Sequence, residues 1–257
     1  MPALLAEDRT VLRLGGADAR KFLQDLVTND VSTLAEGPVY AAILSPQGKY
    51  LFDFFLVDDG ETVLLDVVAD RAPDLAKRLA LYRLRADVTV EETSLRVALI
   101  WGEAPIPGAV PDPRHPALGA RLYAEAPAIG DLQAGARADY DALRVTHLVP
   151  ETGVELQPDA TYILEAGFDR LHGVDFRKGC YVGQEVTARM HHKTELKKGL
   201  VRVAVEGPAP PPGTEVTADG RAAGTLFTTA DGTGLAHLRF DRATGEMQAG
   251  AATLRRL

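Results

Sequence analysis

Cysteine is nearly absent from this chain, because its 257 residues include only one, Cys180. A single cysteine excludes an intramolecular disulfide and a metal site with four thiolate ligands. It leaves two interpretations, a small buried side chain or a reactive thiol. We therefore expect a protein of a reducing compartment, the cytoplasm.

Long apolar runs are also missing. The longest, such as residues 63–68 around Asp66, fall far short of the roughly 20 residues that a membrane-spanning helix requires. Near the start of the chain, Glu7 and Asp8 occupy positions where an export signal would be positively charged. We predict a soluble protein that makes no membrane contact.

Positive charge is in deficit, with 28 Lys and Arg against 36 Asp and Glu and a formal net charge of −8. The field of such a molecule repels phosphate backbones, so we expect no direct nucleic-acid binding. The sequence has no Gly-rich phosphate loop, no dinucleotide fingerprint and no nucleophile elbow. Its 46% apolar and 25% charged residues exclude disordered and collagen-like chains.

Strand and helix patterns are present without strict alternation, which is typical of an α+β fold. Apolar residues between 18 and 27 follow a helical period, and a second helix is expected over 71–84. Residues 39–44, 50–57 and 61–68 are separated by Pro, Asp and Gly turn residues. This spacing predicts an antiparallel meander.

Two proline-rich runs divide the rest of the chain. Residues 104–116 contain five prolines and predict a surface connection, since proline disrupts helix interiors and central strands. Residues 208–212 precede short strand-like pieces joined by Gly-containing turns, the pattern of a small barrel. We predict a body over 1–206 and a C-terminal β-barrel over 207–257.

The stretch around the cysteine, KGCYVGQE at residues 178–185, is chemically the most distinctive. Two glycines flank Cys180 and helix-forming residues follow, which predicts a loop that leads into a helix. The positive end of that helix and Lys178 would both favour a thiolate. The alternative is a buried cysteine beside a tight turn. Gln184 and Glu185 either cap the helix or hydrogen-bond a polar ligand.

Positive charge gathers just after this stretch, where five basic residues stand against one acidic residue between 189 and 202. The segment is either a solvated helix face or a receiver of phosphate or carboxylate groups. The basic residues are Arg189, Lys193, Lys197, Lys198 and Arg202. His191 and His192 are adjacent and point about 100° apart on a helix, so we predict no metal site here.

Three isolated carboxylates, Asp53, Asp66 and Asp74, lie within or near apolar strands or at a helix start. We interpret them as solvent-facing or capping groups.

The quoted residues resemble a known family. Residues 178–185 are similar to the K-G-C-[FY]-x-G-Q-E motif of YgfZ-like folate-binding proteins, which assist iron-sulfur protein maturation. These proteins are relatives of the glycine-cleavage T protein, an aminomethyltransferase. Arg144 resembles part of the family's middle block. The N-terminal blocks of the family resemble residues 14–18, 22–24, 28–31 and 45–49.

The resemblance implies a folate-binding α+β body of ferredoxin-like, antiparallel sheet units in a ring-like arrangement, followed by a C-terminal β-barrel. It implies tetrahydrofolate as the cofactor, with the basic segment facing the carboxylates of its tail, and Cys180 as the catalytic thiol. Aminomethyltransferases carry a catalytic aspartate at a helix start after the meander, near the place of Asp74. The implied folate or thiol environment comprises Lys178, Tyr181, Gln184, Glu185, Arg189, Arg144 and Asp74.

Two main function classes follow from the resemblance. The first is a folate-dependent accessory factor whose partners are reduced folate and iron-sulfur client proteins or their assembly machinery. The alternative is a small folate-dependent aminomethyltransferase that uses Asp74. A third class is an interaction scaffold with a vestigial pocket.

Overall fold

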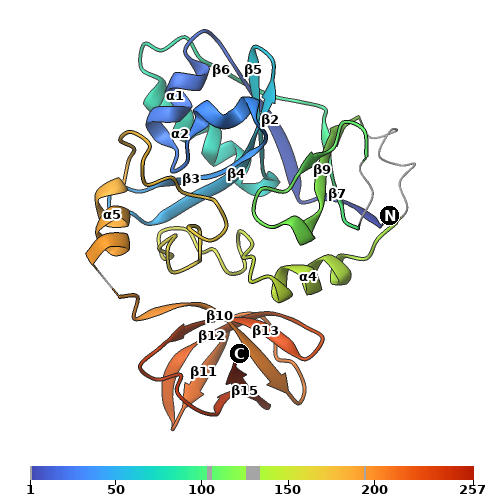
Figure 1. Cartoon of the computed structure of the whole chain (residues 1–257), viewed down its shortest axis with the longest axis vertical. Helices are drawn as coiled ribbons and strands as arrows, with labels where there is room; N and C mark the ends of the chain where they lie inside the picture. Colours follow the sequence, from blue (N-terminus) through green and yellow to red (C-terminus); the bar gives the residue numbers. More distant parts are fainter. Residues whose placement is uncertain (1, 103–105, 126–133, 194) are drawn as a thin grey trace.

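The computed structural model describes residues 2–102, 106–125, 134–193 and 195–257. These residues form two open sheets and a closed barrel, with the barrel below the body in Figure 1. The mixture of antiparallel sheets and a few helices confirms the predicted α+β class and the C-terminal β-barrel. No helix within the described ranges is long and apolar enough to span a membrane.

The first sheet is antiparallel and has the strand order β3-β4-β5-β2-β6. Its strands are β2 (Arg9–Gly15), β3 (Val39–Leu44), β4 (Tyr50–Asp59), β5 (Thr62–Val68) and β6 (Thr89–Glu92). The predicted meander is confirmed as β3, β4 and β5. The helices α1 (Ala19–Leu26) and α2 (Ala72–Arg83) confirm the two predicted helices.

The two faces of this sheet carry different cores, because successive strand residues point to opposite sides. Phe52 and Phe54 of β4 pack with apolar residues of α1 and α2. Phe55 belongs to a second core on the opposite face, toward the middle of the body. Asp53 shares the face of Phe55 by this alternation, and so points away from the helices.

A β-bulge in β4 adds Tyr50 to that same face. Ile43 pairs with Phe52 and Leu44 pairs with Tyr50, so β4 carries one extra residue at this point. Tyr50 and Asp53 are three residues apart and would lie on opposite faces of a regular strand. The bulge allows both side chains to point into the body.

The second sheet is smaller and has the order β1-β7-β9-β8. Its strands are β1 (Ala3–Leu5), β7 (Arg96–Ile100), β8 (Val110–Pro111) and β9 (Ala120–Ala124). In the described ranges, three 3-10 helices accompany the sheets, η1 (Val31–Ala35), η2 (Ala69–Arg71) and η3 (Pro116–Leu118). The described part of the predicted surface connection over 104–116 contains the short edge strand β8, and two of its side chains, Asp112 and Arg114, are buried. Pro105 lies outside the described residues.

Helix α4 (Arg137–Thr146) lies between the second sheet and the barrel in Figure 1. The chain then runs through turns to α5 (Gln184–Lys193). This turn-rich stretch still supplies core side chains, among them Phe168 and Leu171, which are fully buried.

The barrel closes in the order β10-β13-β12-β11-β14-β15. Its strands are β10 (Lys198–Glu206), β11 (Thr214–Ala218), β12 (Arg221–Ala230), β13 (Thr233–Arg239), β14 (Met247–Ala249) and β15 (Ala252–Arg256). The predicted boundary at 206/207 falls inside this barrel. Residues 208–212 connect β10 to β11, so the prolines mark a loop of the barrel and not a linker before it.

Candidate ligand cavity and motif loop

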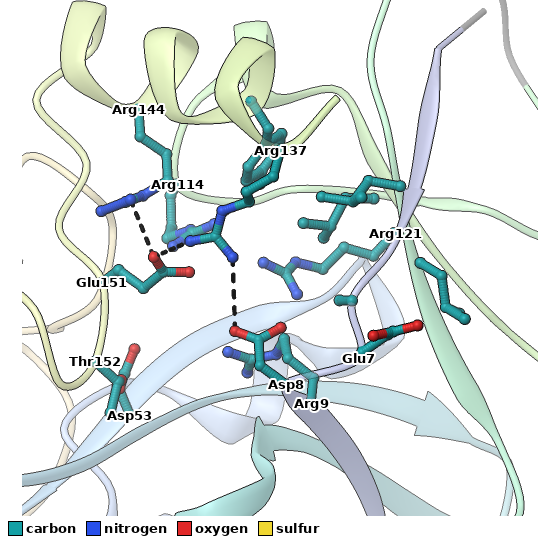
Figure 2. Close-up of a pocket in the computed structure, with 15 residues that line it drawn as sticks. Glu7, Asp8, Arg9, Asp53, Arg114, Arg121, Arg137, Arg144, Glu151 and Thr152 are labelled. Carbon is teal, nitrogen blue, oxygen red and sulfur yellow. Dashed lines mark hydrogen bonds and ion pairs between the residues drawn. The ribbon is translucent and has the colours of Figure 1, made fainter. Parts of the chain in front are cut away.

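A cavity of about 500 Å³ opens between the two sheets and α4 (Figure 2). Its volume lies within the range of about 300–1,000 Å³ that is usual for small-molecule sites. Charged side chains reach it from every side. They are Glu7, Asp8, Arg9, Asp53, Arg114, Arg121, Arg137, Arg144 and Glu151.

One wall is an ionic cluster, here called the arginine cluster, of Arg9, Arg114, Arg121, Asp66 and Asp112. Asp66 accepts from Arg9, and its Oδ2 lies 2.7 Å from Nη1 of Arg121. Asp112 lies 3.1 Å from Nε of Arg121 and accepts two bonds, of 2.8 and 3.0 Å, from the guanidinium of Arg114. Shared carboxylates therefore join the three guanidiniums into one network.

Phe55 lies at the centre of the arginine cluster. The guanidinium carbon of Arg121 is 3.5 Å from the ring centroid, and those of Arg114 and Arg9 are 4.8 and 5.3 Å away. Cations over an aromatic face are attracted by its quadrupole. The ring thus helps to hold three like charges close together.

The arginine cluster keeps its charges despite burial. Burial would raise the pKa of Asp112, but Arg114 and Arg121 outweigh it and hold that pKa well below its usual range. Burial opposes the charge of Arg121, yet Asp66 and Asp112 raise its pKa above the ordinary value. Three cations and two anions leave the cluster with one positive charge in excess.

A second ionic group is formed by Arg137 and Arg144 of α4 and the carboxylates around them. Arg144 is buried, and its guanidinium contacts Asp141 at 2.9 Å, Glu151 at 3.0 Å and Glu155 at 2.9 Å. Its Nε has no hydrogen-bond partner in the described part of the chain. Arg137 is half-exposed and reaches Asp8 across the cavity at 3.7 Å (Figure 2).

Asp53 differs from the other buried carboxylates because hydroxyl groups, not guanidiniums, bind it. It is buried, and the groups that bind it are the hydroxyls of Tyr40 at 2.9 Å, Tyr50 at 2.7 Å and Thr152. Burial and the charge of Asp53 raise the pKa of both tyrosines well above the ordinary value, so they stay protonated and donate. Asp53 thus offers a hydrogen-bond acceptor at the cavity surface.

The two sides of the cavity suit a ligand with two different ends. Asp53 would accept from N–H groups, and guanidiniums bind carboxylates or carbonyl oxygens. A flat polar heterocycle with an anionic tail has this distribution of groups.

The motif loop, residues 178–183, lies apart from the residues that line the cavity. Lys178 is buried, and its ammonium donates to the carbonyls of Gln24, at 2.7 Å, and Val27 at the end of α1. Cationic side chains are favoured at the carboxyl end of a helix. Burial lowers the pKa of Lys178 to about 8. The ammonium anchors the loop to α1.

Cys180 is exposed, so the interpretation as a buried cysteine is wrong. Gly183 allows the loop to approach the turn between β3 and β4, since a Cβ there would lie 2.6 Å from the carbonyl oxygen of Ser45. Its φ of +83° also favours glycine. The loop leads directly into α5, as predicted.

Three other motif residues have local partners. Tyr181 is buried, which raises its pKa to about 12, and the ammonium of Lys178 lies 5.3 Å from its ring centroid. Gln184 begins α5, and its N–H donates to the carbonyl of Tyr181 at 3.2 Å. Glu185 forms a surface ion pair with Arg189 at 2.7 Å, four residues along the helix. Within the cationic segment, Lys198 lies 3.5 Å from Glu165, and Arg202 donates to the carbonyl of Thr146 at 2.7 Å.

Among the residues predicted for the folate or thiol environment, Arg144 lines the cavity and the others do not. Lys178, Cys180, Tyr181, Gln184, Glu185 and Arg189 share one loop and the helix that follows it. Asp74 is an exposed first-turn residue of α2, beside Arg71 and Lys77.

Sequence reasoning missed most of the cavity. Asp53 and Asp66 are buried, so their interpretation as solvent-facing or capping groups is wrong. Strand alternation was the available signal, since Asp53 shares the parity of Phe55 within an otherwise apolar strand. Asp112 and Arg114 gave no such signal within their proline-rich segment.

Comparison with known proteins agrees with this architecture. Residues 197–256 match the family model described as the CAF17 C-terminal β-barrel domain. The fold matches an aminomethyltransferase T of the glycine cleavage system from Bartonella henselae with a TM-score of 0.78. That match covers 100% of this chain and 84% of the other at 14% identity.

Three relatives are named iron-sulfur cluster assembly factor IBA57 or its homologue, mitochondrial. The Homo sapiens protein is 34% identical and the Mus musculus protein 32% identical; each match covers 94% of this chain and 78% of the relative. The Mycosarcoma maydis protein is 36% identical over 79% of this chain, and the match spans 57% of that longer relative.

Proposed function

The chain belongs to the IBA57 family, and we propose that it is an accessory factor for the assembly or repair of iron-sulfur proteins. In this proposal it binds tetrahydrofolate in the cavity and uses Cys180 as its reactive thiol. The names of the relatives support the iron-sulfur role. The partners would be reduced folate and iron-sulfur client proteins or their assembly machinery.

The composition of the cavity carries the folate proposal. Folate has a flat pterin with N–H donors and a glutamate tail with carboxylates. Asp53 would accept from the pterin, and its three hydroxyl partners hold it in place without neutralising it. The excess positive charge of the arginine cluster would attract the carboxylates of the tail.

The exposed thiol supports the second role. A thiolate is a soft ligand for iron, and clusters are usually held by several thiolates. With one cysteine per chain, a stable cluster would need thiols from another protein, so we propose a transient contact with a client. A reducing compartment, the cytoplasm in our proposal, would keep the thiol free.

Aminomethyl transfer is the second candidate, and the fold shared with aminomethyltransferase T favours it. For this candidate we propose Asp53, in place of Asp74, as the residue that such chemistry would use. Asp53 lies in the cavity, whereas Asp74 lies on the exposed start of α2. Release of ammonia from an aminomethyl-lipoyl donor, dependent on tetrahydrofolate, is expected of this candidate alone.

Three substitutions test the proposal. Asp53→Asn should weaken tetrahydrofolate binding by about 10- to 100-fold, since a hydrogen bond to a charged group is worth about 1.5–3 kcal/mol. Asp74→Asn is the matched control and should bind as the wild type does. Cys180→Ser should also bind tetrahydrofolate normally, but fail to restore aconitase-type activity in cells that lack the wild-type gene.

Calorimetric titration and circular dichroism of each purified variant separate binding from folding. Equal affinities for Asp53→Asn and wild type would remove Asp53 from the site. Full complementation by Cys180→Ser would show that the thiol is dispensable and would favour the interaction scaffold.

A further inference from the structure

The barrel contacts the body through a bulge in β12. Leu226 pairs with Ala236 and Thr229 with Gly234, so two residues of β12 oppose the single Leu235 of β13. Thr228 lies in this bulge. Its N–H and its hydroxyl both donate to Oε1 of Glu155, at 3.2 and 2.6 Å. Bulges often redirect groups toward functional sites in this way.

Glu155 belongs to the body, and its side chain is completely buried. While Oε1 takes both donors from the barrel, Oε2 accepts from Nη2 of Arg144 at 2.9 Å and from the N–H of Glu151 at 2.9 Å. Each oxygen therefore receives two hydrogen bonds. A buried carboxylate depends on all of these donors, because unmade bonds to a buried charge are costly.

The groups held by Glu155 form one side of the cavity. Arg144 and Glu151 line it, and the neighbouring Thr152 donates to Asp53. The turn that carries Glu151 and Thr152 also closes on itself, since the N–H of Glu155 donates to the carbonyl of Glu151 at 3.1 Å. A shift of Glu155 would thus move the guanidinium of Arg144 together with the turn that carries Glu151 and Thr152.

We propose that Glu155 is a positioning residue through which the barrel sets the geometry of the cavity. Apolar packing supports the same junction, where Val145 of α4 meets Leu200 and Leu235 of the barrel. Coupling between two sites is reciprocal. A ligand in the cavity tightens the hold on Thr228, and a change in the barrel alters ligand affinity.

The first test removes the hydroxyl donor of the bulge by Thr228→Val, with Thr225→Val on the same strand as the control. In the ligand-free protein, hydrogen exchange of the Glu151 amide should become about tenfold faster in Thr228→Val and stay unchanged in Thr225→Val. Tetrahydrofolate affinity should fall by about tenfold, within the range of typical coupling. Unchanged exchange at Glu151 in a folded Thr228→Val protein would overturn the proposal.

The second test uses the wild-type protein and does not require the variant to fold. Saturation with tetrahydrofolate should slow exchange of the Thr228 amide severalfold and leave Thr225 unaffected. A merely structural role of Glu155 would leave both amides unchanged, and that result would overturn the coupling.

The choice of ligand rests on the proposed function, and the exchange measurement on the free protein separates the two ideas. If tetrahydrofolate fails to bind the wild type while Thr228→Val still accelerates exchange at Glu151, the folate proposal fails and the positioning role of Glu155 stands.

Discussion

Asp66→Asn tests whether the arginine cluster is held together by its buried carboxylates. Asp66 is completely buried and is the anion that joins the two sheets, since Arg9 lies on β2 and Arg121 on β9. The hydroxyl of Tyr123 also donates to its Oδ2 at 2.9 Å. Asparagine has nearly the same shape, so the substitution creates no cavity and changes charge and hydrogen bonding alone.

The loss of stability follows from the charges that remain. Three guanidiniums would face only Asp112, and the new amide would point a donor at groups that are themselves donors. Removing one partner from a buried ion pair costs about 3–5 kcal/mol, because it leaves an uncompensated buried charge. Arg9 is 10% exposed and can turn partly toward water, which favours the lower end of that range.

Thermal and urea unfolding would measure this loss. For a chain of this size we expect a decrease in Tm of about 6–20 °C, and little dependence on salt because the cluster is buried. Asp59→Asn is the control. Its contact with Nε of Arg13 is 3.1 Å long but about 40% exposed, so the change should stay within about 0.5 kcal/mol. Equal unfolding free energies for the two variants would refute the reasoning.

Two further predictions concern the motif loop. Gly183→Ala should lower the unfolding free energy by about 1–3 kcal/mol, because of its positive φ and the carbonyl of Ser45. Gly179→Ala should be neutral in the same melts, since a Cβ there meets no atom within 4 Å. Burial lowers the pKa of Lys178 from 10.5 to about 8, so the unfolded state binds more protons between these values. This residue's contribution to the unfolding free energy should therefore rise with pH from about 8 to 10.5, and urea titrations should show no such contribution in Lys178→Met.

Local patterns were sufficient to predict much of the fold. The meander of β3 to β5 was readable because short turns with Pro, Asp and Gly separate its strands, and α1 because its apolar residues share one face. The start of the barrel at β10 could not be predicted from such local patterns. Strand β10 has no turn signal before it, whereas the prolines after it look like a linker.

The cavity was hard to predict because its residues converge from distant parts of the chain. The bond between Arg121 and Asp66 spans 55 residues, and that between Thr152 and Asp53 spans 99. No local pattern encodes such contacts. Arg144 was expected only through the family resemblance, whereas the motif loop could be predicted because its residues are contiguous.

Folate binding and thiol chemistry, as proposed, require opposite exposure of their side chains. The segment formed by β4 and the turn before it connects the two sites. A bound heterocycle requires desolvated partners, which Asp53 provides from the inner face of this strand. A thiol that meets another protein must lie outside, and Cys180 does so. Gly48, in the turn that precedes β4, is packed against Val186 of α5, where an added Cβ would lie 2.7 Å from that side chain. Strand β4 therefore carries the inward carboxylate, and the turn before it packs against the helix that follows the outward loop, so one segment of the chain links the two proposed sites although they share no residue.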